Sequence, residues 1–188
     1  MADFGVWHIV DNAKNFQPVR TNNYRFLVQG LEELVRVGGD ASNEDDIIKN
    51  AQEVLDFSVI KFDAPHFKQE TIEIKRGNSR AYYAGVPSFE EGTLEINDFA
   101  GADGKSILEA WQNLSYNIID DTIPSSDKYK VNATVLEYLP DNTLLRYWEL
   151  QGCWVTGISE TGYDSESGNK KTVSATIRYD RAIPHRPE

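Results

Sequence analysis

The 188-residue sequence predicts a mainly β fold, an antiparallel β-sandwich or barrel with one or two flanking helices. Apolar and polar residues alternate with a period of two in several short runs, and turn residues separate these runs at close spacing. Helical spacing of apolar residues predicts helices around residues 47–55 and 107–114. Hydrophobic residues make up 40% of the chain and charged residues 26%, which excludes wholesale disorder. We expect a single domain over residues 1–188, because no linker or internal repeat divides the chain.

The N-terminal third predicts an arm, a strand and an acidic insertion. Residues 1–22 are interrupted by Asn, Asp and Pro and are expected to form an extended arm. Residues 24–29 predict a strand that ends at Gly30. Residues 38–56 predict an acidic helical insertion capped by Ser42 or Asn43, and its apolar face comprises Ile47, Ile48, Ala51, Val54 and Leu55. A strand is expected from Phe57 to about Pro65.

The middle of the chain predicts a hairpin, a strand and a helix. Residues 71–76 and 80–84 alternate on either side of the turn at residues 77–79, which is typical of a β-hairpin. Residues 89–99 predict a further strand with Leu94 and Ile96 on one face. Asp103 is expected to cap a helix whose apolar face comprises Ile107, Leu108, Trp111 and Leu114.

The last third predicts a meander of strands. We expect strands at residues 130–139, 144–150, 152–158 and 172–179, with a turn at residues 140–142. The tail at residues 183–188 is expected to stay outside the sheet, because its prolines have no backbone donor.

The sequence shows no arrangement of residues that predicts catalysis, a cofactor or a metal site. The three histidines are scattered, and the Walker A and dinucleotide-binding motifs are absent. The acidic doublets at residues 90–91 and 120–121 would point to opposite faces of a strand, so neither forms a paired-carboxylate site. Cys153 lies in an apolar run and is expected to be a buried hydrophobic residue. We therefore expect no enzyme.

Charge and hydropathy exclude further classes of protein. The net charge is −11, and a basic stripe of the kind that reads nucleic-acid sequence is absent. No apolar run approaches the roughly 18 residues of a membrane helix. The first residues lack the pattern of a signal peptide, and a single cysteine fits synthesis in a reducing cytoplasm. A monomeric carbohydrate-binding β-sandwich stays open as an alternative, because such modules also use aromatic residues on strands.

The order of elements from Tyr24 to Ala182 resembles the tail tube protein family of contractile-tailed phages and related contractile injection systems. The resemblance lies in an opening strand, a basic and aromatic hairpin, the strand and helix that follow, an apolar-glycine-x-tryptophan stretch and a last strand. These segments are residues 23–28, 73–85, 88–96, 105–111, 150–155 and 172–180.

The resemblance implies a non-enzymatic structural subunit of a virion tail, assembled in the host cytoplasm as stacked homohexameric rings. Sheath and baseplate proteins would be its partners, and DNA or an effector would pass through the channel without sequence-specific binding. The basic hairpin predicts interface residues, which are Lys75, Arg76, Asn78, Arg80, Tyr82 and Tyr83. In the tube that the resemblance implies, acidic strand positions would line a lumen that repels phosphates, and we expect Glu73, Glu95 and Glu137 to face it.

Overall fold

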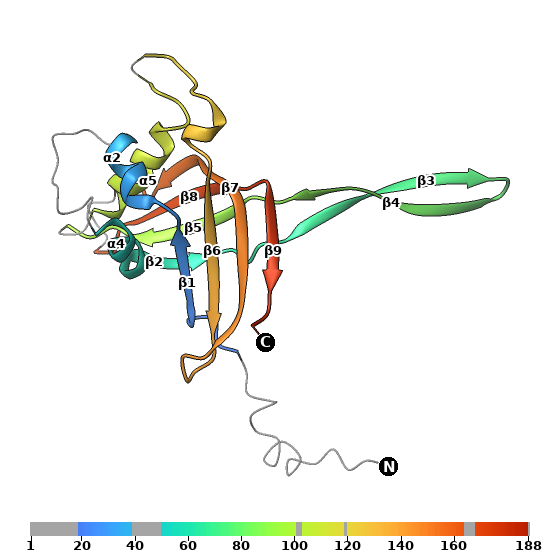
Figure 1. Cartoon of the computed structure of the whole chain (residues 1–188), viewed down its shortest axis with the longest axis horizontal. Coiled ribbons are helices and arrows are strands. Elements are labelled where there is room, and N and C mark those ends of the chain that lie inside the picture. Colours follow the sequence, from blue (N-terminus) through green and yellow to red (C-terminus); the bar gives the residue numbers. More distant parts are fainter. Residues whose placement is uncertain (1–18, 39–49, 101–102, 119, 164–167, 188) are drawn as a thin grey trace, which may run out of the picture.

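The computed structural model describes residues 19–38, 50–100, 103–118, 120–163 and 168–187. These residues form a seven-stranded antiparallel sheet, a separate two-stranded hairpin and three α-helices (Figure 1). The mainly β fold with flanking helices is therefore confirmed. The elements are β1 (Tyr24–Val28), α2 (Leu31–Gly38), α4 (Ala51–Ser58), β2 (Val59–Phe62), β3 (Phe67–Arg76), β4 (Ser79–Phe89), β5 (Gly92–Asn97), α5 (Gly104–Asn113), a 3₁₀ turn (Ser126–Lys128), β6 (Val131–Tyr138), β7 (Leu144–Glu160), β8 (Thr172–Arg178) and β9 (Arg181–His185).

The 17-residue strand β7 belongs to both halves of the sheet. Its first part pairs with β6 and β9, and its second part pairs with β8, which leads on to β5 and β2. The sequence indicated two strands here, separated near Gly152, but the strand is continuous. Gly152 adopts a positive φ of 66° beside the register shift between β6 and β7, so a glycine lets the strand change direction without ending.

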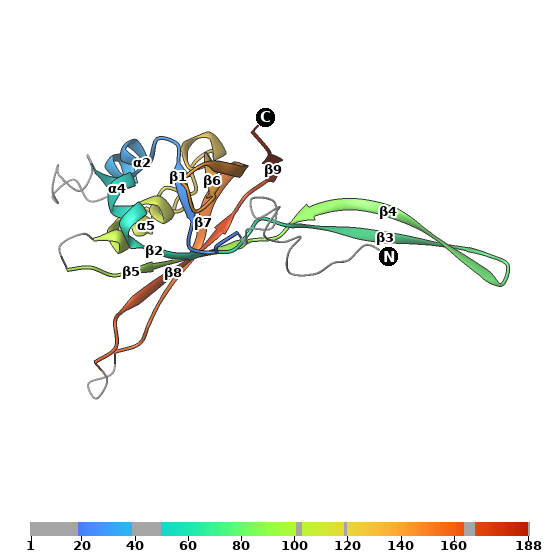
Figure 2. The same ribbon diagram turned by 90° about the horizontal axis from the view of Figure 1, so that it is seen from below.

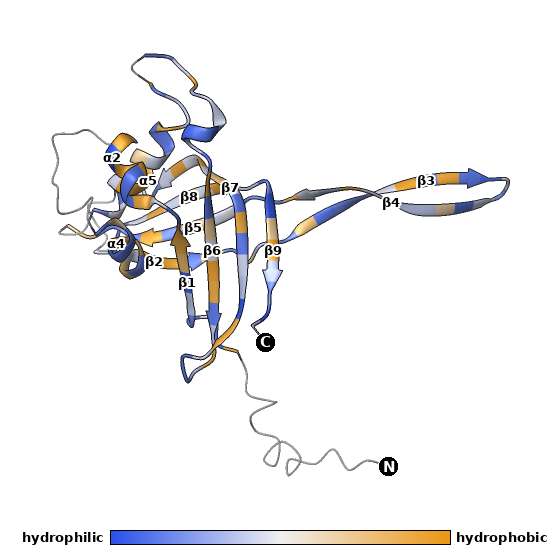
Figure 3. Cartoon of the chain, in the orientation of Figure 1, coloured by the Kyte–Doolittle hydropathy of each residue, from blue (hydrophilic) through white to orange (hydrophobic). Residues whose placement is uncertain are grey.

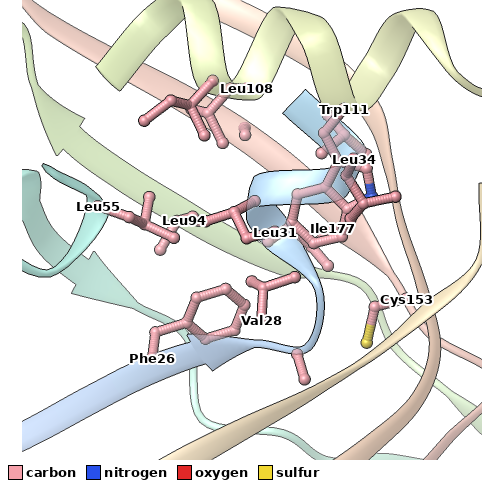
Figure 4. Close-up of a cluster of buried hydrophobic side chains, with 14 of the residues drawn as sticks. Phe26, Val28, Leu31, Leu34, Leu55, Leu94, Leu108, Trp111, Cys153 and Ile177 are labelled. Carbon is pink, nitrogen blue, oxygen red and sulfur yellow. The ribbon is translucent and has the colours of Figure 1, made fainter. Parts of the chain in front are cut away.

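The helices cover one face of this sheet and enclose the hydrophobic core. Leu31 and Leu34 of α2 and Trp111 of α5 pack against the inward-facing residues of the strands, such as Leu94 and Ile177 (Figure 4). The burial pattern of β5 and β8 alternates strictly, as expected for strands with one covered face. In Figure 3 apolar residues gather on the elements of this body, but an apolar stretch also appears on β3, far from the core.

Two helices correct the sequence-based expectations. Helix α2 was not anticipated, although its buried residues Leu31, Leu34 and Val35 have helical spacing. Helix α4 continues through Phe57, which was expected in a strand, and β2 begins only at Val59. The expected caps and the first apolar residues of the insertion, residues 42, 43, 47 and 48, lie outside the described part of the chain.

The cap of α5 is confirmed. The Asp103 side chain accepts a hydrogen bond from the backbone N–H of Ser106 at 3.0 Å, which satisfies a donor that the helix itself leaves unpaired.

The expectation that the C-terminal tail stays outside the sheet is wrong. Residues 181–185 form β9, in which Pro184 lies opposite Trp148 of β7. β9 pairs with β7 alone, and an edge strand tolerates proline because one of its sides needs no backbone donor. Most of the expected N-terminal arm, residues 1–18, lies outside the described part of the chain.

Candidate assembly surfaces

The β3–β4 hairpin projects from the body as a long arm, as both views show (Figures 1 and 2). At its base the rings of Phe67 and Phe89 lie 5.9 Å apart, and Phe89 in turn contacts the core residue Tyr179 at 6.3 Å. Beyond this anchor, β3 and β4 pair only with each other among the described residues. The arm is longer than the sequence-based prediction, which placed its strands at residues 71–76 and 80–84.

The tip of the arm is a tight two-residue turn. Gly77 has a positive φ of 60°, the conformation that the first central position of a type II′ turn requires. The Ser79 hydroxyl donates a hydrogen bond to the Arg76 carbonyl at 2.9 Å and closes the turn. The twist of this turn type matches that of the flanking strands, so the tip holds the two strands in one register.

The arm has an apolar face and a polar face. Ile72 lies opposite Tyr83, and Ile74 lies opposite Ala81. These apolar residues share one face because side chains on a strand alternate between faces. Ile72 is 52% exposed, Ile74 43% and Tyr83 50%, so this face has no cover within the described chain. Contiguous exposed apolar surface of this kind makes the arm a candidate interaction site.

The opposite face of the arm carries the charged residues Glu73, Lys75 and Arg80. Arg80 Nη1 lies 3.1 Å from Glu73 Oε1, so part of the basic charge is already compensated within the arm. Lys75 and Arg76 have no ion pair with any described residue. The basic charge that the arm offers to a partner therefore lies at its tip.

All six predicted interface residues lie on this one arm. Lys75, Arg76, Asn78 and Arg80 surround the tip. Tyr82 and Tyr83 point to opposite faces of β4. Sequence reasoning missed Ile72 and Ile74, although the alternation in Thr71-Ile72-Glu73-Ile74 indicated that these two side chains share a face.

The three predicted lumen residues lie on three strands, β3, β5 and β6, that do not pair with one another. Glu73 is exposed on the arm. Glu95 lies on the face of β5 opposite the buried Leu94 and Ile96, where no helix packs. Glu137 lies on the inward side of β6 near its open end and forms an ion pair with Arg146 at 2.5 Å. A common lumen for the three stays a prediction that only an assembled ring can test.

A recess of about 500 Å³ opens between the start of β1 and the end of β2. Its apolar lining includes Val19, Ile60, Phe62, Pro65 and Val135, and its charged lining comprises Arg20, Lys61, Arg146 and Glu137. The recess exists because β1 and β2 are the two ends of the bent sheet and do not pair with each other.

Gln52 of α4 binds the remaining part of the unpaired edge of β1. Its side-chain amide donates to the Phe26 carbonyl at 2.9 Å and accepts from the Val28 N–H at 3.0 Å. A helix side chain thus takes the hydrogen bonds that a neighbouring strand would make. Arg25 adds an ion pair with Asp56 of α4, with Nε 2.8 Å from Oδ2. The edge of β1 that α4 leaves uncovered is therefore limited to the part around Tyr24, beside the recess.

A network of ion pairs holds β7 and the segment before β8 against α5. Glu160 lies 2.6 Å from Lys105 Nζ and 2.8 Å from Lys171 Nζ, and Lys171 also reaches Asp98 at 3.3 Å. Hydrogen bonds from the two lysines lower the pKa of the Glu160 carboxyl. The pKa of Lys171 is raised, chiefly by Glu160.

Within the described residues, no group of His, Cys, Asp and Glu side chains is placed to hold a metal ion. Cys153 is fully buried, as expected, and burial raises the pKa of its thiol to about 12, so the thiol stays protonated. None of the described helices has the length and apolar character needed to span a membrane.

The described residues thus form a mainly β body with flanking helices and a projecting two-stranded arm. Comparisons with solved structures show the same fold. A chain from the sheath/tube terminator of the extracellular contractile injection system PVC in its extended state superposes with a TM-score of 0.61 at 18% identity, covering 89% of this chain and 96% of that one.

Two further structures extend this likeness. A chain from the PVC sheath–tube complex in the extended state has a TM-score of 0.56 at 16% identity and covers 97% of this chain and 99% of its own length. A chain from the six-fold symmetrised baseplate of the anti-feeding prophage has a TM-score of 0.61 at 10% identity, over 90% and 96% of the two chains. No protein-family model and no curated protein matches the sequence. The chain has the fold found in tube assemblies of contractile injection systems.

Proposed function

We propose that this protein is a non-enzymatic structural subunit of the tube of a contractile injection apparatus or phage-type tail, polymerising as stacked rings. The observation that carries the proposal is the arm, whose apolar face is half-exposed although the body beneath it has a complete core. A two-stranded hairpin is at best marginally stable by itself in water. A second copy of the chain would bury the Ile72 and Ile74 side chains.

Repetition of one contact between copies accounts for a tube. A head-to-tail contact closes into a ring when its rotation closes, and a second contact in another direction stacks the rings. Six subunits per ring are supported by the six-fold symmetry of the baseplate structure to which this fold is similar. The similarity to a chain from a sheath–tube complex supports a sheath as the outer partner of the tube, and the baseplate similarity supports a baseplate at its end.

The charge of the chain suits a channel through which DNA or an effector moves. A net charge of −11 would repel phosphates wherever acidic residues line the lumen, so that cargo slides without binding. Glu73 on the polar face of the arm, Glu95 of β5 and Glu137 of β6 are the predicted contributors to that lining. In a ring, closure of the sheets also removes strand edges that would otherwise favour aggregation.

Electron microscopy of the purified protein tests the proposal directly. We expect rings or tubes from the wild type, and monomers from a variant with Ile72→Thr and Ile74→Thr. Threonine keeps the β-branched shape but removes apolar surface from the arm. A matched control is Val37→Thr on α2, which also removes an exposed apolar residue, 64% exposed, but lies off the arm and should leave assembly intact. A wild-type protein that stays monomeric at high concentration would reject the tube.

The same experiment separates the tube from a carbohydrate-binding module. Such a module needs exposed aromatic platforms. The described tryptophans, Trp111, Trp148 and Trp154, are buried or half-buried, so exposed tyrosines such as Tyr82 and Tyr163 would have to serve. A soluble monomer that binds glycans would favour the module instead.

A further inference from the structure

The loop after α5 protrudes from the body and exposes two large apolar side chains. Ile118 and Ile123 are each 76% exposed, although nothing in the local sequence requires apolar residues there. An antiparallel bridge pairs Asn117 with Thr122, and Asn117 Nδ2 donates a hydrogen bond to Asp120 Oδ2 at 2.9 Å. The described residues on either side of position 119 are thus linked to one another and present an apolar surface.

This projecting loop is also acidic. Asp121 accepts a hydrogen bond from the Tyr116 hydroxyl at 2.8 Å. Neither Asp120 nor Asp121 forms an ion pair with a described cation. The loop thus combines two exposed isoleucines with two carboxylates whose charge no neighbouring cation compensates.

The recess between β1 and β2 has the complementary character. Its lining contains three basic residues and one acidic residue, in a chain whose net charge is −11. Glu137 pairs with Arg146, and Lys61 pairs with Asp63 at 3.0 Å. Arg20 has no ion pair within the described chain. The lining also contains apolar side chains, including Ile60 and Phe62.

The two surfaces lie at opposite ends of the body. In Figure 1 the loop after α5 is at the top, whereas the start of β1 and the end of β6, which line the recess, are at the bottom. One molecule cannot bring them together, but a second copy displaced along β1 and β6 can. The hairpin arm points in a different direction, to the side of the body, so it is free to make a separate contact.

We propose that the loop carrying Ile118, Asp120, Asp121 and Ile123 docks into the β1–β2 recess of a second copy and is the contact that closes the ring. The isoleucines bury against the apolar part of the lining, and the carboxylates face Arg20, the lining cation that has no ion pair within the described chain. The contact is heterologous, since each copy offers a loop at one end and a recess at the other, and such contacts form rings when they close. This inference rests on the proposed tube function and assigns stacking of the rings to the arm.

A charge exchange tests the contact. The loop variant combines Asp120→Lys with Asp121→Asn, because Asp121 has a positive φ of 52° that asparagine tolerates. The recess variant is Arg20→Glu. Each variant alone should raise the protein concentration needed for ring formation about tenfold or more, because it removes an attraction and places like charges together. The variant that carries all three changes should restore assembly towards the wild-type concentration.

A cross-link identifies the partner surface directly. Ile118→Cys combined with Ala64→Cys places one thiol on the loop and one in the recess of the same chain. Mild oxidation of assembled protein should give a ladder of covalent oligomers, whereas each single variant should run as a monomer. The matched control pairs Ala64→Cys with Tyr163→Cys, at a residue that is 89% exposed but on another loop, and should give no ladder. The native Cys153 is buried and does not compete.

The outcomes separate this contact from the proposed function. If the wild type forms rings and the single-surface charge variants form them equally well, the loop–recess contact is rejected and the tube stands. Loss of rings in both variants without recovery in the combined variant also contradicts direct pairing. A wild type that never forms rings rejects the tube and this contact with it. Circular dichroism of each variant checks that the body is folded.

Discussion

The body and the arm of this molecule are stabilised in opposite ways. In the body, Leu94, Trp111 and Ile177 have no exposed surface, and helices cover one face of the sheet. In the arm every residue of β3 is exposed, including two isoleucines. Apolar burial within one chain accounts for the first region and leaves the second incomplete. The difference teaches that the core and the apolar surface proposed for association lie in separate segments, so substitutions can address each in turn.

The largest effect is expected for Trp111→Ala in the body. Removing a fully buried tryptophan leaves a cavity that the surrounding helices and strands only partly fill, and the free energy of unfolding should fall by about 3–5 kcal/mol. Urea denaturation followed by circular dichroism measures this. The control Tyr163→Ala removes an aromatic residue that is 89% exposed and should change stability by less than about 0.5 kcal/mol. Equal effects of the two would contradict the placement of the core.

A smaller loss is expected for Gly152→Ala in β7. A Cβ atom at this position would lie 2.3 Å from Asp180 Oδ2, and the φ of +66° strains any other residue. Asp180 is also held by Lys130 at 2.7 Å, so it cannot move away without breaking an ion pair. We expect a loss of about 1–3 kcal/mol, measured as above. A stability equal to that of the wild type would show that the strand bends elsewhere.

The corresponding change in the arm, Gly77→Ala, should leave the body intact. Its φ is also positive, at +60°, but nothing lies within 4 Å of an added Cβ atom. Alanine at this positive φ should cost about 1 kcal/mol. This cost affects only the turn, because the tip has no contact with the core. We expect an unchanged urea midpoint for the body and weaker assembly. A shift of the midpoint as large as that of Gly152→Ala would mean that arm and body unfold as one unit.

The smallest effect concerns pH. The folded-state pKa of Glu160 is lowered by Lys105 and Lys171, so its contribution to stability is present above its unfolded value and is lost as the pH falls through the folded pKa. Melting temperatures between about pH 3 and about pH 6 should therefore decline less steeply for Glu160→Gln than for the wild type. Identical profiles would show that the ion network makes no net contribution.

Much of the fold was predictable because its signals are local. The alternation around Leu94 and Ile96 and the cap at Asp103 both identified their elements. The missed elements depend on tertiary context. Pro184 argued against a strand, but β9 lies at an edge of the sheet. The pattern predicted separate strands at residues 144–150 and 152–158, but β7 runs on through Gly152. Helix α2 had a usable signal in Leu31, Leu34 and Val35 that the acidic surroundings concealed.

Among the candidate surfaces, too, those with a local sequence signal were predictable and the others were not. The arm was predictable, since its strands and turn are contiguous in the sequence. The recess was not, because Arg20, Ile60 and Glu137 meet only when two unpaired ends of one sheet come together. Ile118 and Ile123 gave no signal of a surface projection, since isolated apolar residues in a loop have no period.

The shared strand β7 couples the local unfolding of the two halves of the sheet. Because its 17 residues are hydrogen-bonded to β6 and β9 at one end and to β8 at the other, neither half of the sheet can separate without pulling on the same strand. The two halves therefore exchange their amide hydrogens as one cooperative unit, whereas the arm, which is joined to the body only at its base, exchanges independently. A subunit built this way can reshape its arm during assembly while its body keeps a single structure.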